Sequence, residues 1–393
     1  MSDVMEANLT ETYRHLLFKR HWRLTESSAF LLGQCKAYVE AMIKTPILPK
    51  HHEQLLGVAL IKGAQATTAI EGNTLSEKEI EDIVEGKKLP PSKEYQQIEV
   101  KNILEAFNEL LQNVVGKNQV GVITPEYVKH LHLLVGKGLG EHLDAIPGRF
   151  RRDRRIVNRY RCPAPEDVEI LIDRLCEWIK TEFHFDRGQS FEDVVIQAIV
   201  THVYLEWIHP FGDGNGRTGR LIEFYILLRG GLPDIASHIL SNHYNLTRSD
   251  YYRQLENAGR NADLTEFIQY ALLGFRDGLK QTLEIIQQSQ KEITWQKYVY
   301  DVFAAKPMKR KDTFKRQRDL MLQLPIEKII SLQDFAEERG KLVVKYGGFS
   351  LKTLKRDIEE LKQMHLIDEI DGNYITATHF IKGSQARQRE VCW

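Results

Sequence analysis

One twelve-residue segment constrains this chain most: a polar, glycine-rich loop that stands between two long apolar stretches. The loop reads His209-Pro-Phe-Gly-Asp-Gly-Asn-Gly-Arg-Thr-Gly-Arg220. The apolar periodicity of Phe191 to Ile208 predicts a buried helix, which the proline and the first glycine of the loop end. A second helix is predicted to begin near Asn215 and to end at Gly230-Gly231. The loop therefore lies at a helix N-terminus, where free backbone N–H groups and the helix dipole attract anions.

The side chains of this loop have complementary chemical uses. His209 can take a proton from a hydroxyl nucleophile, and Asp213 can hold Mg²⁺ against phosphate oxygens. Arg217 and Arg220 can neutralise a phosphate chain, and Asn215 can donate to a phosphate or cap the following helix. Singly, a His at a helix end is often structural, and Asp-Gly or Asn-Gly is often only a turn. A turn does not need the whole combination, so the loop indicates a phosphate-handling active site.

The loop resembles the signature of the Fic family, His-Pro-Phe-x-Asp-Gly-Asn-Gly-Arg-x-Gly-Arg, at every fixed position. The resemblance implies an α-helical fold that transfers AMP from Mg-ATP to a protein hydroxyl and releases pyrophosphate. It implies His209 as the general base, Asp213 as the Mg²⁺ ligand and Arg220 as the partner of the γ-phosphate. The rest of the implied nucleotide-binding set is Gly212, Gly214, Asn215, Gly216 and Arg217. The related Doc toxins phosphorylate with ATP held in reverse and carry Lys where this chain has Gly216, which favours nucleotidyl transfer.

A second motif lies far upstream, at the end of a helix predicted over Gln54 to Ile70. Thr67 and Glu71 are four residues apart and share one face of that helix. By itself, a Glu before a Gly-Asn helix end is an ordinary solvated residue. The segment also resembles the inhibitory motif Ser/Thr-x-x-x-Glu-Gly/Asn of one class of Fic proteins, which implies that Glu71 pairs with Arg220 and blocks the γ-phosphate. Glu71 is then a brake or, alternatively, a residue that orients water to remove AMP from proteins.

The segment from Gly148 to Pro163 departs from the helical pattern. A short β-branched centre flanked by arginines predicts an exposed hairpin, and a solvated basic loop is the alternative. Fic proteins carry a flap hairpin here, which binds the target as an added strand. The resemblance implies Ile156 and Val157 as target clamps, and the arginines favour acidic targets.

A tyrosine pair further along the chain, before a helical segment that is predicted to end near Gly274, gives the predicted adenosine pocket. Consecutive tyrosines in a helix more often pack in a core than bind a base. The family resemblance nevertheless places Tyr251 and Tyr252 at this pocket. The Asn that some relatives place seven residues after the second Tyr falls on Gly259 here, which leaves the ribose contact unassigned.

Composition is consistent with this interpretation. The 393 residues are 42% hydrophobic and carry a net charge of zero, so general binding to nucleic acids or membranes is not indicated. The four cysteines have neither C-x-x-C spacing nor His partners at zinc spacing, and we expect reduced thiols. We find no signal peptide and no apolar run long enough to span a bilayer, so a cytoplasmic location is expected.

The C-terminal third has a different pattern. A capped helix from Ser331 to Gly340, a second from Ser350 to Leu361, and a hairpin with an Asp371-Gly372-Asn373 turn resemble a winged helix-turn-helix. DNA binding and a protein-interaction or dimerisation role both remain open. Three basic residues of the second helix can meet phosphates, although Asp357, Glu359 and Glu360 oppose this; they are Lys352, Lys355 and Arg356.

Together these features predict a mainly α protein: a Fic helical core with a short β-hairpin flap and a C-terminal winged helix-turn-helix domain. The expected parts are an N-terminal helical region with the inhibitory motif, the Fic core, a linker helix and the winged-helix-like domain, at 1–95, 96–275, 276–308 and 309–393. The expected function is self-inhibited AMP transfer from Mg-ATP to a Tyr, Thr or Ser of a target or of the chain itself. The alternatives are a DNA-binding regulator with a nucleotide-sensing pocket, and Glu71-dependent AMP removal.

Overall fold

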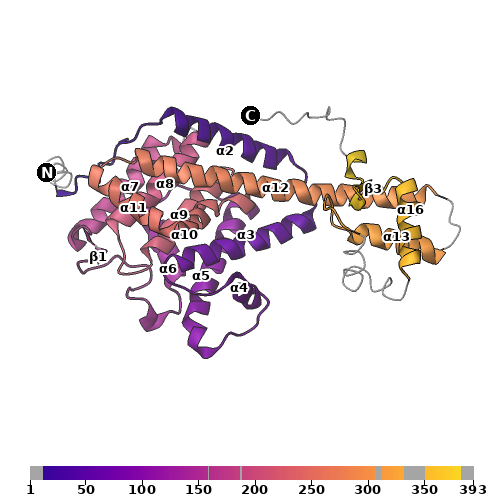
Figure 1. The fold of residues 1–393 in the computed structure, drawn as a ribbon. Coiled ribbons are helices and arrows are strands. Elements are labelled where there is room, and N and C mark those ends of the chain that lie inside the picture. The colour runs from indigo at the N-terminus through magenta and orange to yellow at the C-terminus, as the bar shows by residue number, and fades with distance from the viewer. Residues whose placement is uncertain (1–11, 158, 186–187, 307–310, 332–349, 382–393) are drawn as a thin grey trace. The chain divides into compact units, whose positions relative to one another are not determined.

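A computed structural model describes residues 12–157, 159–185, 188–306, 311–331 and 350–381 of the chain (Figure 1). The chain divides into two compact units, 1–284 and 285–393. Each unit has its own buried core, and we describe them in turn.

Two buried helices form the centre of the first unit. Helix α8 spans Phe191–Ile208, as the sequence predicts, and α9 spans Asn215–Arg229. Both helices are buried on almost every face. Burial explains why α8 is apolar on all sides rather than striped, whereas α9 buries the polar side chains of its first turns together with an apolar second half. Ser190 and Asp193 form a reciprocal capping box that fixes where α8 begins. The predicted active-site loop joins the two helices, so it is anchored at both ends in the core.

Amphipathic helices surround this pair and bury one side each, with α8 and α9 at the centre of the unit (Figure 1). Thr25 caps α2, Thr124 caps α6, and Pro125 begins α6 with a backbone angle suited to the first helical turn. The surrounding helices are α2 Glu26–Lys44, α3 Pro49–Ala69, α4 Glu77–Val84, α5 Glu94–Leu111, α6 Pro125–Gly136, α7 Val168–Glu182, α10 Ile239–Leu246 and α11 Arg248–Asn261.

The predicted hairpin is present between α6 and α7. Strand β1, Ile156–Val157, pairs antiparallel with β2, Tyr160–Arg161. Ile156 is 65% exposed and Val157 is 37% exposed, so both apolar side chains face solvent. The hairpin therefore offers an accessible strand edge next to the active-site loop, and we call residues 148–163 the flap.

The helix that follows α11 is longer than the sequence indicates. A helical segment was expected to end near Gly274, but α12 runs without a break from Thr265 to Ala304. Gly274 is needed for packing rather than for a stop, because a Cβ at this position would lie 2.0 Å from the His243 ring. Helix α12 thus passes through the boundary expected at 275/276, and the division between the two compact units falls at 284/285.

The second unit contains two described helices besides the end of α12, and one hairpin. Helices α13 Lys311–Gln323 and α16 Leu351–Gln363 pack with the antiparallel strands β3 Ile367–Ile370 and β4 Asn373–Thr376 around a core that includes Trp295 and Leu361. Ser350 caps α16, and Asp371 and Gly372 both take positive φ in the predicted turn. The helix expected from Ser331 to Gly340 lies almost entirely outside the described residues.

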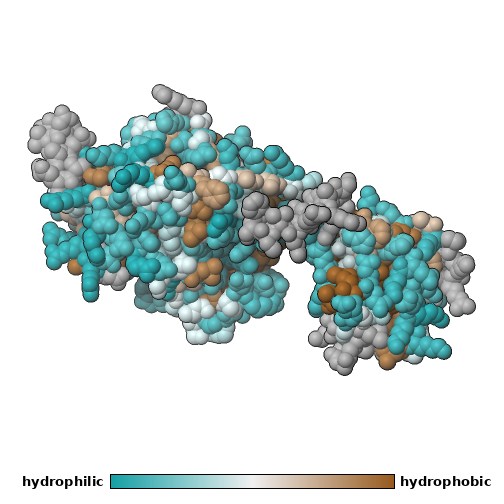
Figure 2. Space-filling view, turned by 45° about the horizontal axis from the view of Figure 1, so that its top comes forward, coloured by the Kyte–Doolittle hydropathy of each residue, from teal (hydrophilic) through white to brown (hydrophobic). Residues whose placement is uncertain are grey.

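The face of the described residues that Figure 2 shows is mostly hydrophilic, with small separate hydrophobic areas. Within the described ranges, none of the helices combines the length and the apolar character that a membrane span requires. Cys35, Cys162 and Cys176 are free thiols, as expected, and Cys392 lies outside the described residues.

Candidate active site

The loop between α8 and α9 reverses the chain through two left-handed residues. His209 ends α8 with φ 51° and ψ 60°, and Gly214 precedes α9 with φ 79°. A side chain with a Cβ adopts this conformation only rarely, so His209 is held in a less favoured backbone state at the centre of the predicted site. No side chain caps the N-terminus of α9. The N–H groups of its first turn are therefore placed to meet an anion, as predicted.

Asn215 shapes the loop. The sequence allowed it to cap the following helix, but Gly214 occupies the cap position and Asn215 is already helical. Its side chain accepts a hydrogen bond from the Phe211 N–H at 2.8 Å and donates one to the Phe211 carbonyl at 2.9 Å. These two bonds close the turn, so the capping interpretation was wrong, and phosphate binding by Asn215 stays a prediction.

The first arginine of the loop is held between two carboxylates. Arg217 donates from Nη1 to Glu99 Oε1 at 2.5 Å and from Nη2 to Asp213 Oδ1 at 2.9 Å, with only 4% of its side chain exposed. Glu99 also accepts from Asn73 at 3.0 Å, so it joins Arg217 to the residue after the Glu71-Gly72 pair. The sequence pattern did not single out Glu99, because one Glu on an amphipathic helix is indistinguishable from a surface residue.

The second arginine meets the upstream motif. Arg220 Nη2 donates to Glu71 Oε1 at 2.6 Å and to the Thr67 carbonyl at 2.9 Å, and its Nε donates to Thr67 Oγ1 at 2.7 Å. Residues about 150 positions apart are therefore in direct contact, as the family resemblance implied. Gly216 makes room for this contact, since a Cβ there would lie 2.1 Å from Glu71 Oε1.

The side chains of Arg220 and Glu71 differ in how far they are buried. The Arg220 side chain is 1% exposed, whereas that of Glu71 is 32% exposed. Partial burial works against the ionised form of Glu71, but the charge and hydrogen bond of Arg220 outweigh it and lower the pKa of the Glu71 carboxyl. Glu71 is therefore an anion at neutral pH, and it occupies donors that the γ-phosphate is expected to need.

His209 has the protonation state that a base requires. Burial, together with the nearby charge of Arg151, lowers the pKa of His209 to about 4. The imidazole is neutral at neutral pH and is able to accept a proton.

Two residues that the sequence did not single out hold the loop in place. Arg151 is 5% exposed, and its guanidinium donates to the His209 carbonyl at 2.7 Å, the Asp153 carbonyl at 2.7 Å and the Pro163 carbonyl at 2.6 Å. It joins the flap to the loop, although its sequence neighbours suggested an exposed basic run. The sequence alone does not distinguish one buried arginine from the exposed arginines beside it.

His132 supports the loop from α6. Its Nδ1 accepts a hydrogen bond from the Gly148 N–H at 2.9 Å, so Nε2 carries the proton and donates to the Asp213 carbonyl at 2.9 Å. The imidazole stacks on Phe211 with ring centroids 3.7 Å apart. Burial lowers the pKa of His132 to about 4, which keeps this arrangement intact at neutral pH. In the sequence, the one sign of this supporting role is a His on the apolar face of the predicted helix.

The N-terminal segment braces the flap. Tyr13 donates to Asp167 Oδ2 at 2.6 Å and accepts from the Ala164 N–H at 2.9 Å. His15 Nε2 lies 2.8 Å from the Tyr160 hydroxyl, which donates to the Trp207 carbonyl at 2.6 Å. The chain of contacts from His15 thus ends two residues before His209.

The predicted adenosine-pocket tyrosines differ in exposure. Tyr251 is 1% exposed, and its hydroxyl lies 3.0 Å from His202 Nε2, so it is part of the core. Tyr252 is 37% exposed, and its hydroxyl donates to the Ile70 carbonyl at 3.4 Å, beside Glu71. Only Tyr252 presents a substantially open ring, and the binding role of both residues stays a prediction.

Asp213 suits a metal that is held mainly by phosphate oxygens. Both described contacts of its carboxylate use Oδ1, from the Gly214 N–H and from Arg217, and its side chain is 37% exposed. Across the residues that the structure describes, no three His, Cys, Asp or Glu side chains gather as a metal site. Mg²⁺ at nucleotide sites commonly uses one or two carboxylates and completes its shell with phosphates and water, so Asp213 fits this group.

These features define a helical protein with a glycine-rich loop at a helix N-terminus whose two arginines are engaged by carboxylates. Comparison with known proteins agrees: residues 122–227 match the Fic/DOC family. The central part of the chain, residues 122–227, is therefore similar to the Fic/DOC family.

Several curated proteins share this similarity. The chain is 31% identical over 205 residues to a protein named protein adenylyltransferase Fic from Nematostella vectensis, over 52% of this chain and 44% of that protein. It is 31% identical over 239 residues to a protein of the same name from Culex quinquefasciatus, over 60% of this chain and 43% of that protein. The chain spans less than half of the length of these relatives.

Solved structures show the same fold. A Fic family protein from Desulfovibrio desulfuricans aligns with a TM-score of 0.55 at 20% identity, over 91% of this chain and 98% of that one. Fic-1 from C. elegans aligns with a TM-score of 0.54 at 22% identity, over 67% of this chain and 74% of that one.

Proposed function

We propose that this protein is an adenylyltransferase that moves AMP from ATP to a hydroxyl side chain of a protein and that it is self-inhibited by Glu71. The observation that carries the proposal is the engagement of Arg220 by Glu71 and Thr67 beside the His209 loop. The names of the relatives, protein adenylyltransferase Fic, support the type of reaction.

The chemistry follows from the side chains present. The neutral imidazole of His209 takes the proton of a target Tyr, Thr or Ser hydroxyl as its oxygen attacks the α-phosphorus of ATP. The bond from the α-phosphorus to the bridging oxygen breaks, and pyrophosphate leaves. Arg217, Arg220 and the first N–H groups of α9 hold the phosphate chain. Mg²⁺ at Asp213 supplies charge neutralisation for the phosphates.

Self-inhibition follows from competition for Arg220. Its fork of donors binds either a carboxylate or a phosphate, and Glu71 now holds part of it. While Glu71 stays, the γ-phosphate cannot reach this donor, and ATP is not placed for attack. Movement of the end of α3 is therefore the step that activates the site.

Parallel incubations of the purified chain with ATP labelled at the α or the γ phosphorus test the reaction type. Wild-type chain and its Glu71→Gly variant are incubated with Mg²⁺ and a cell lysate, and protein-bound label is measured. AMP transfer leaves only the α label on protein. Retention of the γ label would instead show phosphoryl transfer and would overturn the proposal.

A further inference from the structure

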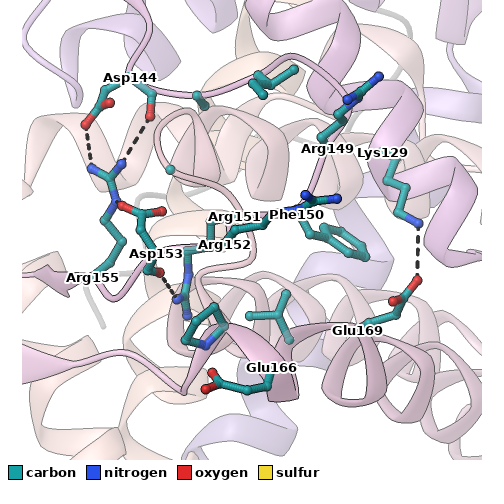
Figure 3. Close-up of a pocket in the computed structure, with 16 residues that line it drawn as sticks. Lys129, Asp144, Arg149, Phe150, Arg151, Arg152, Asp153, Arg155, Glu166 and Glu169 are labelled. Atoms are coloured by element: carbon teal, nitrogen blue, oxygen red, sulfur yellow. Dashed lines mark hydrogen bonds and ion pairs between the residues drawn. The ribbon is translucent and has the colours of Figure 1, made fainter.

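A pocket of about 990 Å³ lies beside the active-site loop, on the side of the flap base (Figure 3). Its walls come from the loop at 144–146, the first part of the flap at 148–155, the start of α7 and Gly212 of the active-site loop. Apart from Gly212, the residues that line this pocket take no direct part in the proposed reaction of ATP, so their charges need a separate explanation.

The pocket is joined to the active-site loop by direct contacts. A Cβ at Gly212 would lie 2.3 Å from the Asp144 carbonyl oxygen, so the two segments touch there. The Arg151 N–H donates to the Pro210 carbonyl at 2.9 Å, and its guanidinium donates to the His209 carbonyl at 2.7 Å. A group bound in the pocket therefore lies next to the loop that carries the predicted base.

Most charges in the pocket are already neutralised. Arg155 pairs with Asp144 at 2.6 Å and with Asp153 at 2.7 Å, at the end of the pocket opposite Lys129 in Figure 3. Lys129 lies over the Phe150 ring at 4.5 Å and 3.8 Å from Glu169.

The Arg151 guanidinium is occupied by backbone carbonyls, which leaves two lining cations. Arg149 and Arg152 are exposed, and neither forms an ion pair within the described part of the chain. Glu166 is the remaining lining carboxylate in that part of the chain. The pocket therefore keeps two guanidinium groups for an outside anion, against one carboxylate.

The flap determines where along a target segment this anion must lie. A target strand that pairs with β1 runs past the exposed Ile156 and Val157. Since a strand advances about 3.3 Å per residue, target residues beside Arg152 are about four positions away from those beside Ile156. A carboxylate a few residues from the modified hydroxyl can thus reach the pocket while the hydroxyl faces His209.

We propose that this pocket selects target segments that carry an Asp or Glu a few residues from the acceptor hydroxyl, through Arg149 and Arg152. This proposal deepens the proposed function and rests on it for the position of the acceptor. Binding of the acidic segment itself does not depend on AMP transfer.

The test uses two fluorescent peptides and three full-length proteins. Both peptides carry one central Tyr. At the third and fourth positions on each side of this Tyr, the first peptide has Glu and the second has Gln. The proteins all contain Glu71→Gly: one has no other change, one adds Arg149→Glu with Arg152→Glu, and the control adds Arg154→Glu with Arg159→Glu. The control makes the same change of charge at exposed positions of the same hairpin that do not line the pocket. Binding is measured by fluorescence anisotropy, and AMP transfer is measured from the α label.

We expect the Glu peptide to bind about fivefold more tightly than its Gln twin, as suits two partly exposed ion pairs. The pocket variant removes this preference, and the control keeps most of it. Equal binding of the twins, or equal loss in the control, overturns the pocket proposal. A preference that depends on the pocket, without AMP transfer to any peptide, supports the pocket and contradicts the proposed function. AMP transfer to the peptides without a preference for the Glu peptide supports the proposed function and contradicts the pocket proposal.

Discussion

Replacement of Glu71 by Gly is expected to increase AMP transfer. The change removes the carboxylate that holds Arg220 Nη2 at 2.6 Å, while the two hydrogen bonds from Arg220 to Thr67 remain. Arg220 therefore stays in its place, and the freed donor becomes available to the γ-phosphate. Loss of most other carboxylates near an ATP site is expected to leave activity unchanged or to reduce it.

The size of the effect follows from the geometry of the pair. A hydrogen bond to a charged group contributes about 1.5–3 kcal/mol. Because the Glu71 side chain is 32% exposed, solvent weakens the pair, and we take the lower figure. About 1.5 kcal/mol corresponds to roughly a tenfold shift in favour of productively bound ATP. We therefore expect AMP transfer to rise by about one order of magnitude in the Glu71→Gly chain.

The assay is incorporation of the α label into protein over time, together with calorimetric titration of ATP. Glu85→Gly is the matched control, because Glu85 also lies at a helix end but contacts Lys87 on the surface rather than the loop. The double variant Glu71→Gly with Arg220→Ala is expected to lose most of the gain, since the released arginine is absent. An unchanged or lower rate in Glu71→Gly, at intact fold, refutes the reasoning. Loss of an AMP-removing activity that the wild-type chain has would instead assign catalysis to Glu71.

Further predictions concern the base, the metal, the brace of the flap and the C-terminal unit. In the Glu71→Gly background, His209→Ala should abolish transfer but leave ATP titration nearly unchanged, because the phosphate donors remain. Because the folded pKa of His209 is lowered to about 4, its neutral form persists as pH falls, and kcat/KM measured against pH should keep its value well below pH 6.5; a fall centred near pH 6.5 that follows His209 protonation would contradict this burial argument. Asp213→Ala should abolish the Mg²⁺ dependence of ATP binding, and an unchanged metal titration would leave Asp213 as a turn residue only. Tyr13→Phe should raise KM for a protein target several-fold with little change in ATP affinity, because it loosens the segment at 164–167 directly after the flap and not the loop. Equal effects on both would indicate general destabilisation. In the second unit, replacement of three basic residues of α16 by Ala should weaken binding to duplex DNA and reduce its salt dependence, and no binding of the intact chain at low salt would favour an interaction module; these are Lys352, Lys355 and Arg356.

The parts of the fold that the sequence predicted best are those where one local signal was enough. Helix α8 has its predicted bounds because Ser190 caps it and Pro210 follows it directly. For the flap, the charged stretch around Ile156 and Val157 allowed either a hairpin or a solvated loop, and the family resemblance favoured the hairpin that the structure has. The contact of Glu71 with Arg220 was reached only through the family resemblance, since no local rule joins residues 149 positions apart.

The parts that the sequence did not predict depend on tertiary contacts. Gly274 was taken as the end of a helix, but it lets α12 pass the His243 ring. Asn215 has a side chain that suits a helix cap, yet the turn at Phe211 uses it instead. Arg151 and His132 hold the active-site loop through backbone carbonyls, and such bonds carry no pattern in the residue sequence.

Intact-protein mass spectrometry separates AMP transfer from phosphoryl transfer and shows whether the transfer needs His209 and is held back by Glu71. Three chains are incubated with Mg-ATP: wild type, Glu71→Gly, and Glu71→Gly with His209→Ala. We expect a mass increase of one or more AMP moieties on a hydroxyl side chain in Glu71→Gly, little in wild type, and none in the double variant. A phosphate-sized increase, or an AMP-sized increase that persists without His209, would contradict this expectation.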